Sequence, residues 1–193
     1  MSAIEGAQVI AKCDAGKSVL VVCDLQQRLG DAMPGKVLNR VLLNATLLAR
    51  AAGLLELPVL CTEQYPQGLG ATHPSVADAL PRTTPKFTKS AFSCCDGQDF
   101  NVALSDLARS QVVLVGMEAH ICILQTAFDL RARGLTVFVV EDAICSRRLE
   151  NYQNALDRLR QAAVQVVSAE SVVFEWLRDA NHPHFKAVQT LLR

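Results

Sequence analysis

The sequence is poor in aromatic residues and carries no net charge. Its 193 residues include one Trp, two Tyr and seven Phe, although half of the chain is hydrophobic. The core must therefore be aliphatic, and this hydrophobicity excludes an intrinsically disordered chain. Nineteen basic and nineteen acidic residues cancel. Because nucleic acids and anionic membranes attract clustered positive charge, we expect neither as a partner.

Targeting and membrane-spanning patterns are also missing. Residues 1–16 lack a basic start followed by an apolar run, so they are interpreted as an N-terminal arm and not as a signal peptide. The apolar stretch at residues 41–49 is much shorter than the roughly 20 residues that a membrane-spanning helix needs. The length favours one domain over residues 1–193, and we expect it in the cytoplasm.

The cysteine pattern excludes a disulfide framework. The chain has seven cysteines, an odd number, and no C-x-x-C pair. We interpret them as free thiols in a reducing compartment. Cys23 and Cys61 are expected in the core, and the vicinal Cys94 and Cys95 are expected as unpaired surface thiols, with a redox role left open. Cys145 follows a predicted strand, and whether it faces a site is also left open.

Short β-branched runs alternate with helical patterns along the chain. We predict strands at residues 18–23, 58–62, 86–89, 112–116, 136–140 and 164–167. Helices are predicted at residues 37–55, 99–109, 119–133 and 152–162, followed by a helical tail, with a loop over 64–84 that holds a short helix at 75–80. This order predicts a three-layer, doubly wound α/β fold, with a six-stranded parallel sheet and helices on both faces. Its active site should lie at the carboxyl ends of the strands.

Two glycine-containing segments match nucleotide-binding motifs without the context those motifs need. Residues 11–18 fit a relaxed phosphate-loop pattern, but a strand follows where a helix is required. Residues 68–73 begin like a dinucleotide fingerprint but lack its third glycine. We therefore expect no nucleotide cofactor.

Three polar residues stand at predicted strand ends, where the fold would bring them together. Taken singly, Asp24 could cap a segment, Lys89 could lie at the surface and Cys122 could pack in the core. Together they favour chemistry. A helix N-terminus and a lysine stabilise a thiolate, and an aspartate in reach can accept the thiol proton. Backbone amides at the same turn can hold an oxyanion.

The motifs around these residues resemble those of the isochorismatase-like cysteine hydrolases. The matching segments are residues 23–26, 89–93 and 116–123. Residues 61–70 and 182–186 resemble the isochorismatase-domain-containing subgroup in particular. The resemblance covers essentially the whole chain and implies the fold already predicted.

The resemblance also implies the roles of particular residues. It assigns Asp24, Lys89 and Cys122 to a catalytic triad. It implies a non-proline cis peptide bond between Met117 and Glu118. The backbone N–H groups of Glu118 and Cys122 would form the oxyanion hole.

The implied activity is hydrolysis of a small amide-like molecule through a thioester. Nicotinamidases of this superfamily carry an Asp-x-His metal motif, and residues 61–65 hold no histidine here, so we expect no metal and no cofactor. A homo-oligomer, dimer or tetramer, is implied by the family. Two alternatives stay open: a catalytically silent member that binds a small molecule or partner, and a nicotinamidase-type amidase.

Four further residues are candidates for the substrate pocket. They are Gln64, Tyr65, Phe92 and His120. For Tyr65 and Phe92 the alternative is buried packing. For His120 the alternative is a position at a subunit boundary.

Overall fold

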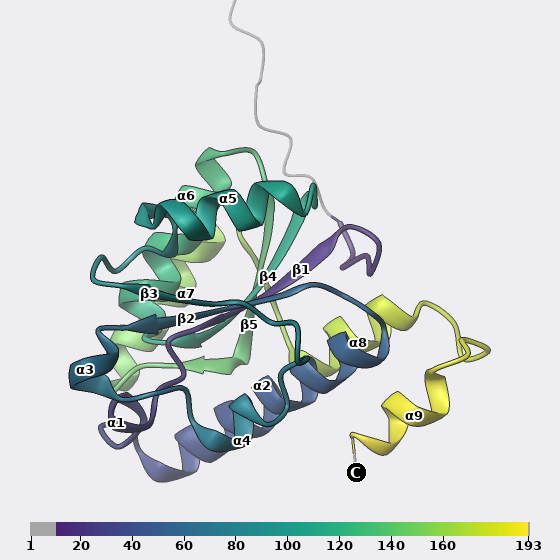
Figure 1. Cartoon of the computed structure of the whole chain (residues 1–193), viewed down its shortest axis with the longest axis horizontal. Helices are drawn as coiled ribbons and strands as arrows, with labels where there is room; N and C mark the ends of the chain where they lie inside the picture. Colours follow the sequence, from purple (N-terminus) through teal and green to yellow (C-terminus); the bar gives the residue numbers. More distant parts are fainter. Residues whose placement is uncertain (1–10, 193) are drawn as a thin grey trace, which may run out of the picture.

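Six parallel strands form the central sheet in a computed structural model that describes residues 11–192 (Figure 1). Their order across the sheet is β3-β2-β1-β4-β5-β6, the order of a doubly wound dinucleotide-binding fold. The strands are β1 (Ser18–Cys23), β2 (Val59–Gln64), β3 (Lys86–Lys89), β4 (Gln111–Met117), β5 (Thr136–Cys145) and β6 (Gln165–Val167). The predicted α/β class and six-stranded parallel sheet are confirmed.

Helices cover both faces of this sheet, as Figure 1 shows. They are α1 (Gln27–Gly30), α2 (Gly35–Leu54), α3 (Pro66–Leu69), α4 (Pro74–Ala77), α5 (Gln98–Asp106), α6 (Leu124–Ala132), α7 (Leu149–Gln161), α8 (Ala169–Leu177) and α9 (Phe185–Thr190). A 3₁₀ turn, η1 (Cys94–Asp96), precedes α5, and a π-helical turn, η2 (Ala119–Ile123), precedes α6.

The alternation of side chains along each strand builds two separate cores. Leu20 and Val22 of β1 point to the side covered by α2 and α8, where the buried residues include Ala45, Leu48 and Trp176. Val19, Val21 and Cys23 belong to the opposite core, together with apolar residues of α5, α6 and α7. All six residues of β1 are buried, which explains why this strand shows no polar alternation.

Several predicted element boundaries differ from the structure. β5 continues to Cys145, five residues beyond its predicted end, and β2 continues to Gln64. The segment predicted as one helix from residue 119 begins instead as the π-helical turn η2. The short helix predicted at residues 75–80 occupies Pro74–Ala77, and the same loop also holds α3.

The predicted N-terminal arm lies partly outside the described residues, which begin at residue 11. Its described part packs against the body of the protein. Cys13 is fully buried, and its amide donates to the Glu175 carboxylate at 2.6 Å. The Asp14 amide donates to Gln111 Oε1 at 2.7 Å. Within residues 11–192, no helix is both long and apolar enough to cross a bilayer.

Candidate active site

The strand order reverses between β1 and β4, and this switch point needs a glycine. Gly116 pairs with Cys23 and has a φ of +136°. A Cβ atom there would lie 1.8 Å from the Cys23 carbonyl oxygen. Only glycine therefore lets the carboxyl ends of β1 and β4 approach this closely. The residues that follow these two strands, Asp24 and Glu118, open the candidate site.

Asp24 is fully buried, and its carboxylate is held from both sides. Lys89 Nζ lies 2.6 Å from Oδ2, and the Thr62 hydroxyl donates to Oδ1 at 2.8 Å. The Asp24 backbone has a φ of +53°, in the left-handed region that aspartate tolerates better than most residues. The predicted strand ends thus bring Asp24 and Lys89 into a buried ion pair.

Lys89 is surrounded by oxygen acceptors. Its ammonium donates to Asp24, to Gln64 Oε1 at 2.7 Å and to the Phe92 carbonyl at 3.0 Å. The carbonyl of Ala91 lies 3.3 Å away. Burial works against the charge of Lys89, but the acidic groups beside it, the Cys23 thiol and the Asp24 carboxyl, outweigh this and raise the pKa of Lys89. The ammonium is therefore charged throughout the physiological pH range.

Cys122 lies inside the turn η2, directly after the end of β4. It is 5% exposed and belongs to the same buried cluster as Cys23 and Cys94. The peptide bond between Met117 and Glu118 is cis. The Glu118 carbonyl accepts hydrogen bonds from the amides of Ile121 and Ile123, which tightens the turn around Cys122.

The Glu118 side chain has a role that the sequence did not indicate. Its carboxylate is buried and accepts hydrogen bonds from the Arg147 amide at 3.0 Å and from Arg147 Nε at 3.1 Å. These bonds join the start of the η2 turn to the segment after β5. The sequence did hold a signal, because Glu118 is an acidic residue between two buried segments. A buried carboxylate in such a place needs a hydrogen-bond or charged partner.

Cys23, Cys94 and Cys122 form a cluster of thiols beside the ion pair. The sulfur atoms of Cys23 and Cys94 are 3.6 Å apart, and Cys94 Sγ also lies 3.6 Å from Thr62 Oγ1. Hydrogen bonding to Cys122 and to Cys94 raises the pKa of Cys23. The hydrogen bond between Cys23 and Cys94 lowers the pKa of Cys94.

The prediction that Cys94 and Cys95 are surface thiols is wrong. They are 1% and 4% exposed, because the η1 turn folds them under the start of α5. The Cys94 amide donates to the Thr126 hydroxyl at 2.9 Å. The Cys95 amide donates to Ser93, whose hydroxyl in turn binds the Asp129 carboxylate. Cys23 and Cys61 are buried, as predicted.

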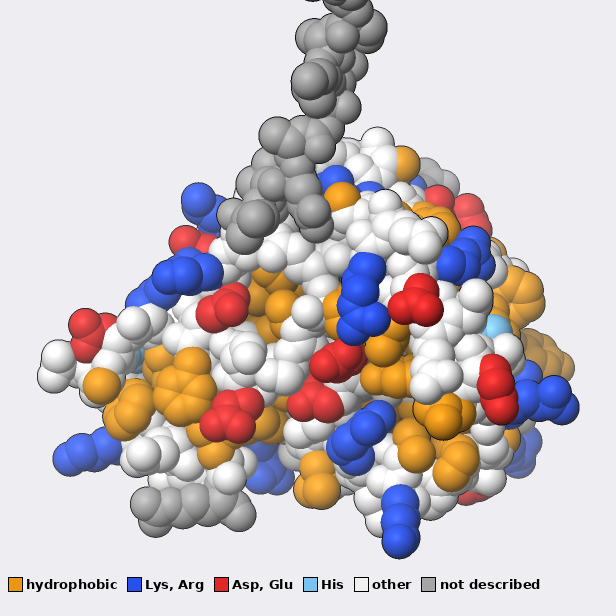
Figure 2. Space-filling view, turned by 180° about the vertical axis from the view of Figure 1, so that it is seen from behind, with side chains coloured by type: hydrophobic (Ala, Val, Ile, Leu, Met, Phe, Trp, Pro, Cys, Tyr) orange, Lys and Arg blue, Asp and Glu red, His pale blue; other side chains and the backbone are white. Residues whose placement is uncertain are grey.

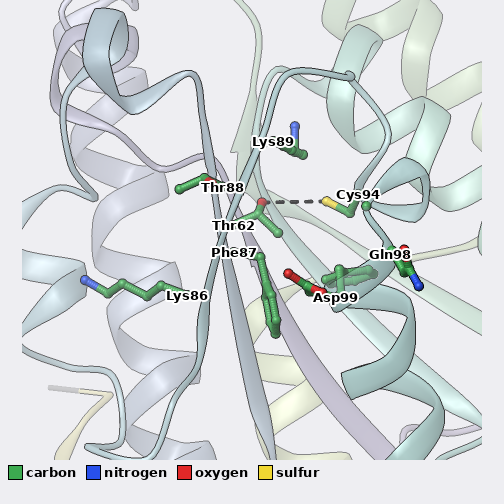
Figure 3. Close-up of a pocket in the computed structure, with 10 residues that line it drawn as sticks. Thr62, Lys86, Phe87, Thr88, Lys89, Cys94, Gln98 and Asp99 are labelled. Atoms are coloured by element: carbon green, nitrogen blue, oxygen red, sulfur yellow. Dashed lines mark hydrogen bonds between the residues drawn. The ribbon is translucent and has the colours of Figure 1, made fainter.

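A cavity of about 380 Å³ opens between β3 and the start of α5. Its walls include Thr62, Lys89, Cys94 and the ring of Phe87, which packs edge-on against Phe100. Figure 3 shows the Cys94 sulfur and the Thr62 hydroxyl pointing toward each other, whereas the Lys86 side chain extends away from Cys94. Cys122 is not among the residues that line this cavity.

Three of the four pocket candidates lie around Lys89. Gln64 accepts from the Lys89 ammonium and donates to the Ser90 carbonyl at 2.7 Å, so its amide is a support of the lysine. Tyr65 and Phe92 are 59% and 53% exposed, so buried packing is excluded for both. Tyr65 lines a hollow together with Lys89.

The fourth candidate, His120, has its ring held by two polar residues that follow β5. One ring nitrogen lies 2.9 Å from the Ser146 hydroxyl and the other 3.2 Å from the Asn151 amide nitrogen. Cys145 is 1% exposed and packs in the core under α2, on the face of the sheet opposite Cys122. It therefore does not approach the triad residues.

Metal ligands do not cluster in the described part of the chain. No group of three His, Cys, Asp or Glu side chains within residues 11–192 is arranged to hold a metal ion. His182 and His184 stand near each other, with ring centres 5.7 Å apart, but they lie in the turn before α9.

Comparison with known families identifies the chain. A family model described as "Isochorismatase domain" matches residues 18–171, most of the chain. The chain belongs to the isochorismatase family. The match contains the predicted triad positions Asp24, Lys89 and Cys122, and the resemblance read from the motifs is confirmed.

Relatives of this family match over nearly the full length. Isochorismatase domain-containing protein 2 of Danio rerio is 38% identical and covers 95% of this chain and 90% of its own. A structure titled MAR1 ribonuclease from Caenorhabditis elegans is 37% identical, with a TM-score of 0.89 and coverage of 94% and 92%. The Escherichia coli YcaC gene product, described as an octameric hydrolase of unknown specificity, has the same fold at 24% identity, with a TM-score of 0.80 and coverage of 94% and 96%. The chain therefore has an isochorismatase-family hydrolase fold.

Proposed function

We propose that this isochorismatase-family protein is a metal-independent cysteine hydrolase that cleaves the C–N bond of a small amide-like molecule. The observation that carries the proposal is the buried ion pair of Asp24 and Lys89 beside the Cys122 turn. Burying two charges costs several kcal/mol per ion, and the attraction between the charges only offsets this cost. Apolar residues at the same positions would make the protein as stable, so the ion pair indicates a use other than stability.

Activation of the nucleophile is the first step. Asp24 accepts the Cys122 thiol proton, and the positive charge of Lys89 stabilises the thiolate that results. The Thr62 hydroxyl and Gln64 keep the carboxylate and the ammonium in place.

Acyl transfer then proceeds in two stages. The Cys122 thiolate attacks the amide carbon, and the N–H groups of Glu118 and Cys122 stabilise the oxyanion. The C–N bond breaks, Asp24 returns its proton to the leaving nitrogen, and a thioester remains. Water, deprotonated by Asp24, attacks the thioester and releases the acid, which restores the thiol.

Two alternatives have less support. A catalytically silent member would have no need for Asp24, Lys89 and Cys122 together. A nicotinamidase-type amidase with a metal would need a ligand cluster, and residues 11–192 offer none. We further propose that the enzyme acts in the cytoplasm as a homo-oligomer, in line with the oligomeric Escherichia coli neighbour.

RNA is a weaker substrate candidate than a small amide, although the nematode relative is titled a ribonuclease. RNA binding needs clustered basic residues that neutralise phosphates. On the face shown in Figure 2, basic and acidic side chains are intermixed, and the whole chain has a net charge of zero. No basic groove marks this face as an RNA path.

The proposal is tested by screening small amides for ammonia release. The wild type should release ammonia from at least one amide, and the activity should survive dialysis against a chelator. Cys122→Ala should reduce the rate to that of the buffer blank. A rate that persists in Cys122→Ala, or that disappears with the chelator, would exclude the mechanism. Cleavage of RNA by the wild type and not by Cys122→Ala would replace the amide with RNA as substrate.

A second measurement needs no substrate. The rate of Cys122 alkylation by iodoacetamide is followed by mass spectrometry at neutral pH, in the wild type and in Asp24→Asn. Asn cannot accept the thiol proton, so labelling should slow by about tenfold or more. Equal rates in both proteins would remove Asp24 from the role of base. Ala155→Ser, in the buried face of α7, is a control outside the ion pair.

A further inference from the structure

Cys94 and Cys23 form a thiol pair for which the proposed mechanism has no use. Their sulfur atoms are 3.6 Å apart in the interior, between the end of β1 and the turn η1. A disulfide bond needs about 2.05 Å, so the sulfurs must approach by only about 1.5 Å. Cys94 Sγ also lies 3.6 Å from the Thr62 hydroxyl.

The two sulfurs differ in access. Cys94 lines the 380 Å³ cavity between β3 and α5, whereas Cys23 is fully buried and does not line it. A molecule the size of hydrogen peroxide that enters this cavity therefore meets Cys94 first. The hydrogen bond between Cys23 and Cys94 also lowers the pKa of Cys94, which favours the thiolate form that peroxide attacks.

The two backbones differ in freedom to move. Cys23 ends the central strand β1, which is paired on both sides. Cys94 starts a single 3₁₀ turn outside the sheet, where its amide donates one hydrogen bond to the Thr126 hydroxyl. The approach of the two sulfurs is therefore expected to move Cys94 toward Cys23 and not the reverse.

We propose that Cys94 and Cys23 form a reversible disulfide when the protein meets a hydroperoxide, and that this bond inactivates the site. Cys94 is the residue that peroxide attacks, and Cys23 is the residue that resolves the product. The disulfide itself does not depend on the proposed hydrolase, whereas the loss of hydrolysis rests on it.

One peroxide molecule is the oxidant for each disulfide that forms. The Cys94 thiolate attacks a peroxide oxygen, an S–O bond forms, the O–O bond breaks, and hydroxide leaves to become water with the thiol proton. The Cys23 thiol then attacks the sulfenic sulfur. An S–S bond forms, the S–O bond breaks, and the departing hydroxide takes the Cys23 proton as a second water. Two thiols lose two electrons, and peroxide is reduced to two waters.

The movement of Cys94 would reach the catalytic lysine through the chain. The segment before Cys94 supplies the carbonyls of Ala91 and Phe92 that accept hydrogen bonds from Lys89. Thr62, which Cys94 touches, holds Asp24. Both changes weaken the support of the ion pair.

The experiment maps the thiols of the folded full-length protein before and after peroxide. After the peroxide treatment the protein is unfolded in urea, so that the buried Cys23 and Cys94 react, and free thiols are blocked with N-ethylmaleimide. Oxidised thiols are then reduced with dithiothreitol and labelled with iodoacetamide, and peptides are assigned by mass. Cys23 and Cys94 should lose the first label together and gain the second, and the linked peptides should be found without reduction. Ammonia release should fall in step and return with dithiothreitol.

Variants separate this disulfide from other oxidation. Cys94→Ala should leave Cys23 open to N-ethylmaleimide after peroxide, and Cys94→Ser serves if the alanine variant does not fold. Cys95→Ala is the matched control from the same buried turn and should form the disulfide as the wild type does. A disulfide that contains Cys122, or oxidation of Cys122 while Cys23 and Cys94 stay free, would overturn the proposal. A disulfide in a protein that hydrolyses no amide would uphold it and refute only the hydrolase.

Discussion

The Thr62 hydroxyl donates a 2.8 Å hydrogen bond to Oδ1 of Asp24, while the Asp24 amide donates to the Thr62 carbonyl at 3.1 Å. Thr62 and Asp24 are thus joined by one side-chain and one backbone hydrogen bond, near the ends of neighbouring strands. Lys89 occupies the other carboxylate oxygen. Asp24 is therefore fixed in direction before any substrate arrives, and such preorganisation is what general acid–base catalysis requires.

Replacement of Thr62 by valine should lower activity more than stability. The variant keeps the shape of the side chain but leaves Asp24 Oδ1 without its donor, so we expect a fall of about tenfold to a hundredfold in kcat/KM and a loss of about 1 kcal/mol in the free energy of unfolding. Thr62→Ser keeps the hydroxyl and should retain most of the activity. Wild-type kcat/KM in the valine variant would show that the bond has no part in the reaction.

Because Asp24 and Lys89 form an ion pair, we expect the stability losses from replacing each of them to be non-additive. Lys89→Met leaves a buried carboxylate without a partner, and we expect it to lower the free energy of unfolding by about 3–5 kcal/mol. Lys89→Met combined with Asp24→Asn removes both charges and should recover much of that stability, while activity stays absent. Urea unfolding of the two single variants and the double variant measures this coupling. Additive losses would argue against an interaction between the two side chains.

Periodicity predicted the layers of the fold because both cores are built from strands buried on two faces. β1 shows this most directly, since Val19 and Leu20 enter opposite cores. Boundaries were less accurate where backbone geometry departs from the regular pattern. The π-helical turn around Cys122 has the same residue types as an α-helix, so its composition does not distinguish the two.

The candidate triad was proposed because its members follow predicted strand ends, whereas Thr62 was not predicted and Gln64 was predicted only as a pocket residue. Thr62 and Gln64 lie on β2, and no spacing rule connects them to Asp24 or Lys89. The burial of Cys94 depends on how the η1 turn packs under α5, which is a long-range contact. The vicinal pair was expected at the surface, and tertiary packing overrode that expectation.

We expect a single methyl group added at Gly116 to lower the stability of the fold severely. In Gly116→Ala the new Cβ would lie 1.8 Å from the Cys23 carbonyl oxygen, at a φ of +136° that alanine avoids. We expect a loss of about 4 kcal/mol or more, or failure to fold. Gly35→Ala is the matched control, because nothing lies within 4 Å of its added Cβ at the start of α2, and it should be neutral or slightly stabilising. Similar unfolding curves for the two variants would contradict the close approach of β1 and β4.

The buried thiols predict that stability falls at alkaline pH. Burial raises the pKa of Cys61 and of Cys95 to about 11, from an ordinary value of 9.0. The unfolded chain therefore loses these protons first, so their contribution to stability is complete below pH 9 and is lost as the pH rises through about 11. Each thiol can lower the free energy of unfolding by up to about 1.4 kcal/mol per pH unit in that window. In urea unfolding from pH 8 to 11, the free energy of unfolding should fall less steeply with pH for Cys95→Ala than for the wild type. The slopes are compared, so a pH-independent difference in stability between the two proteins does not affect the test. Parallel declines would mean that Cys95 ionises equally in the folded and unfolded chains.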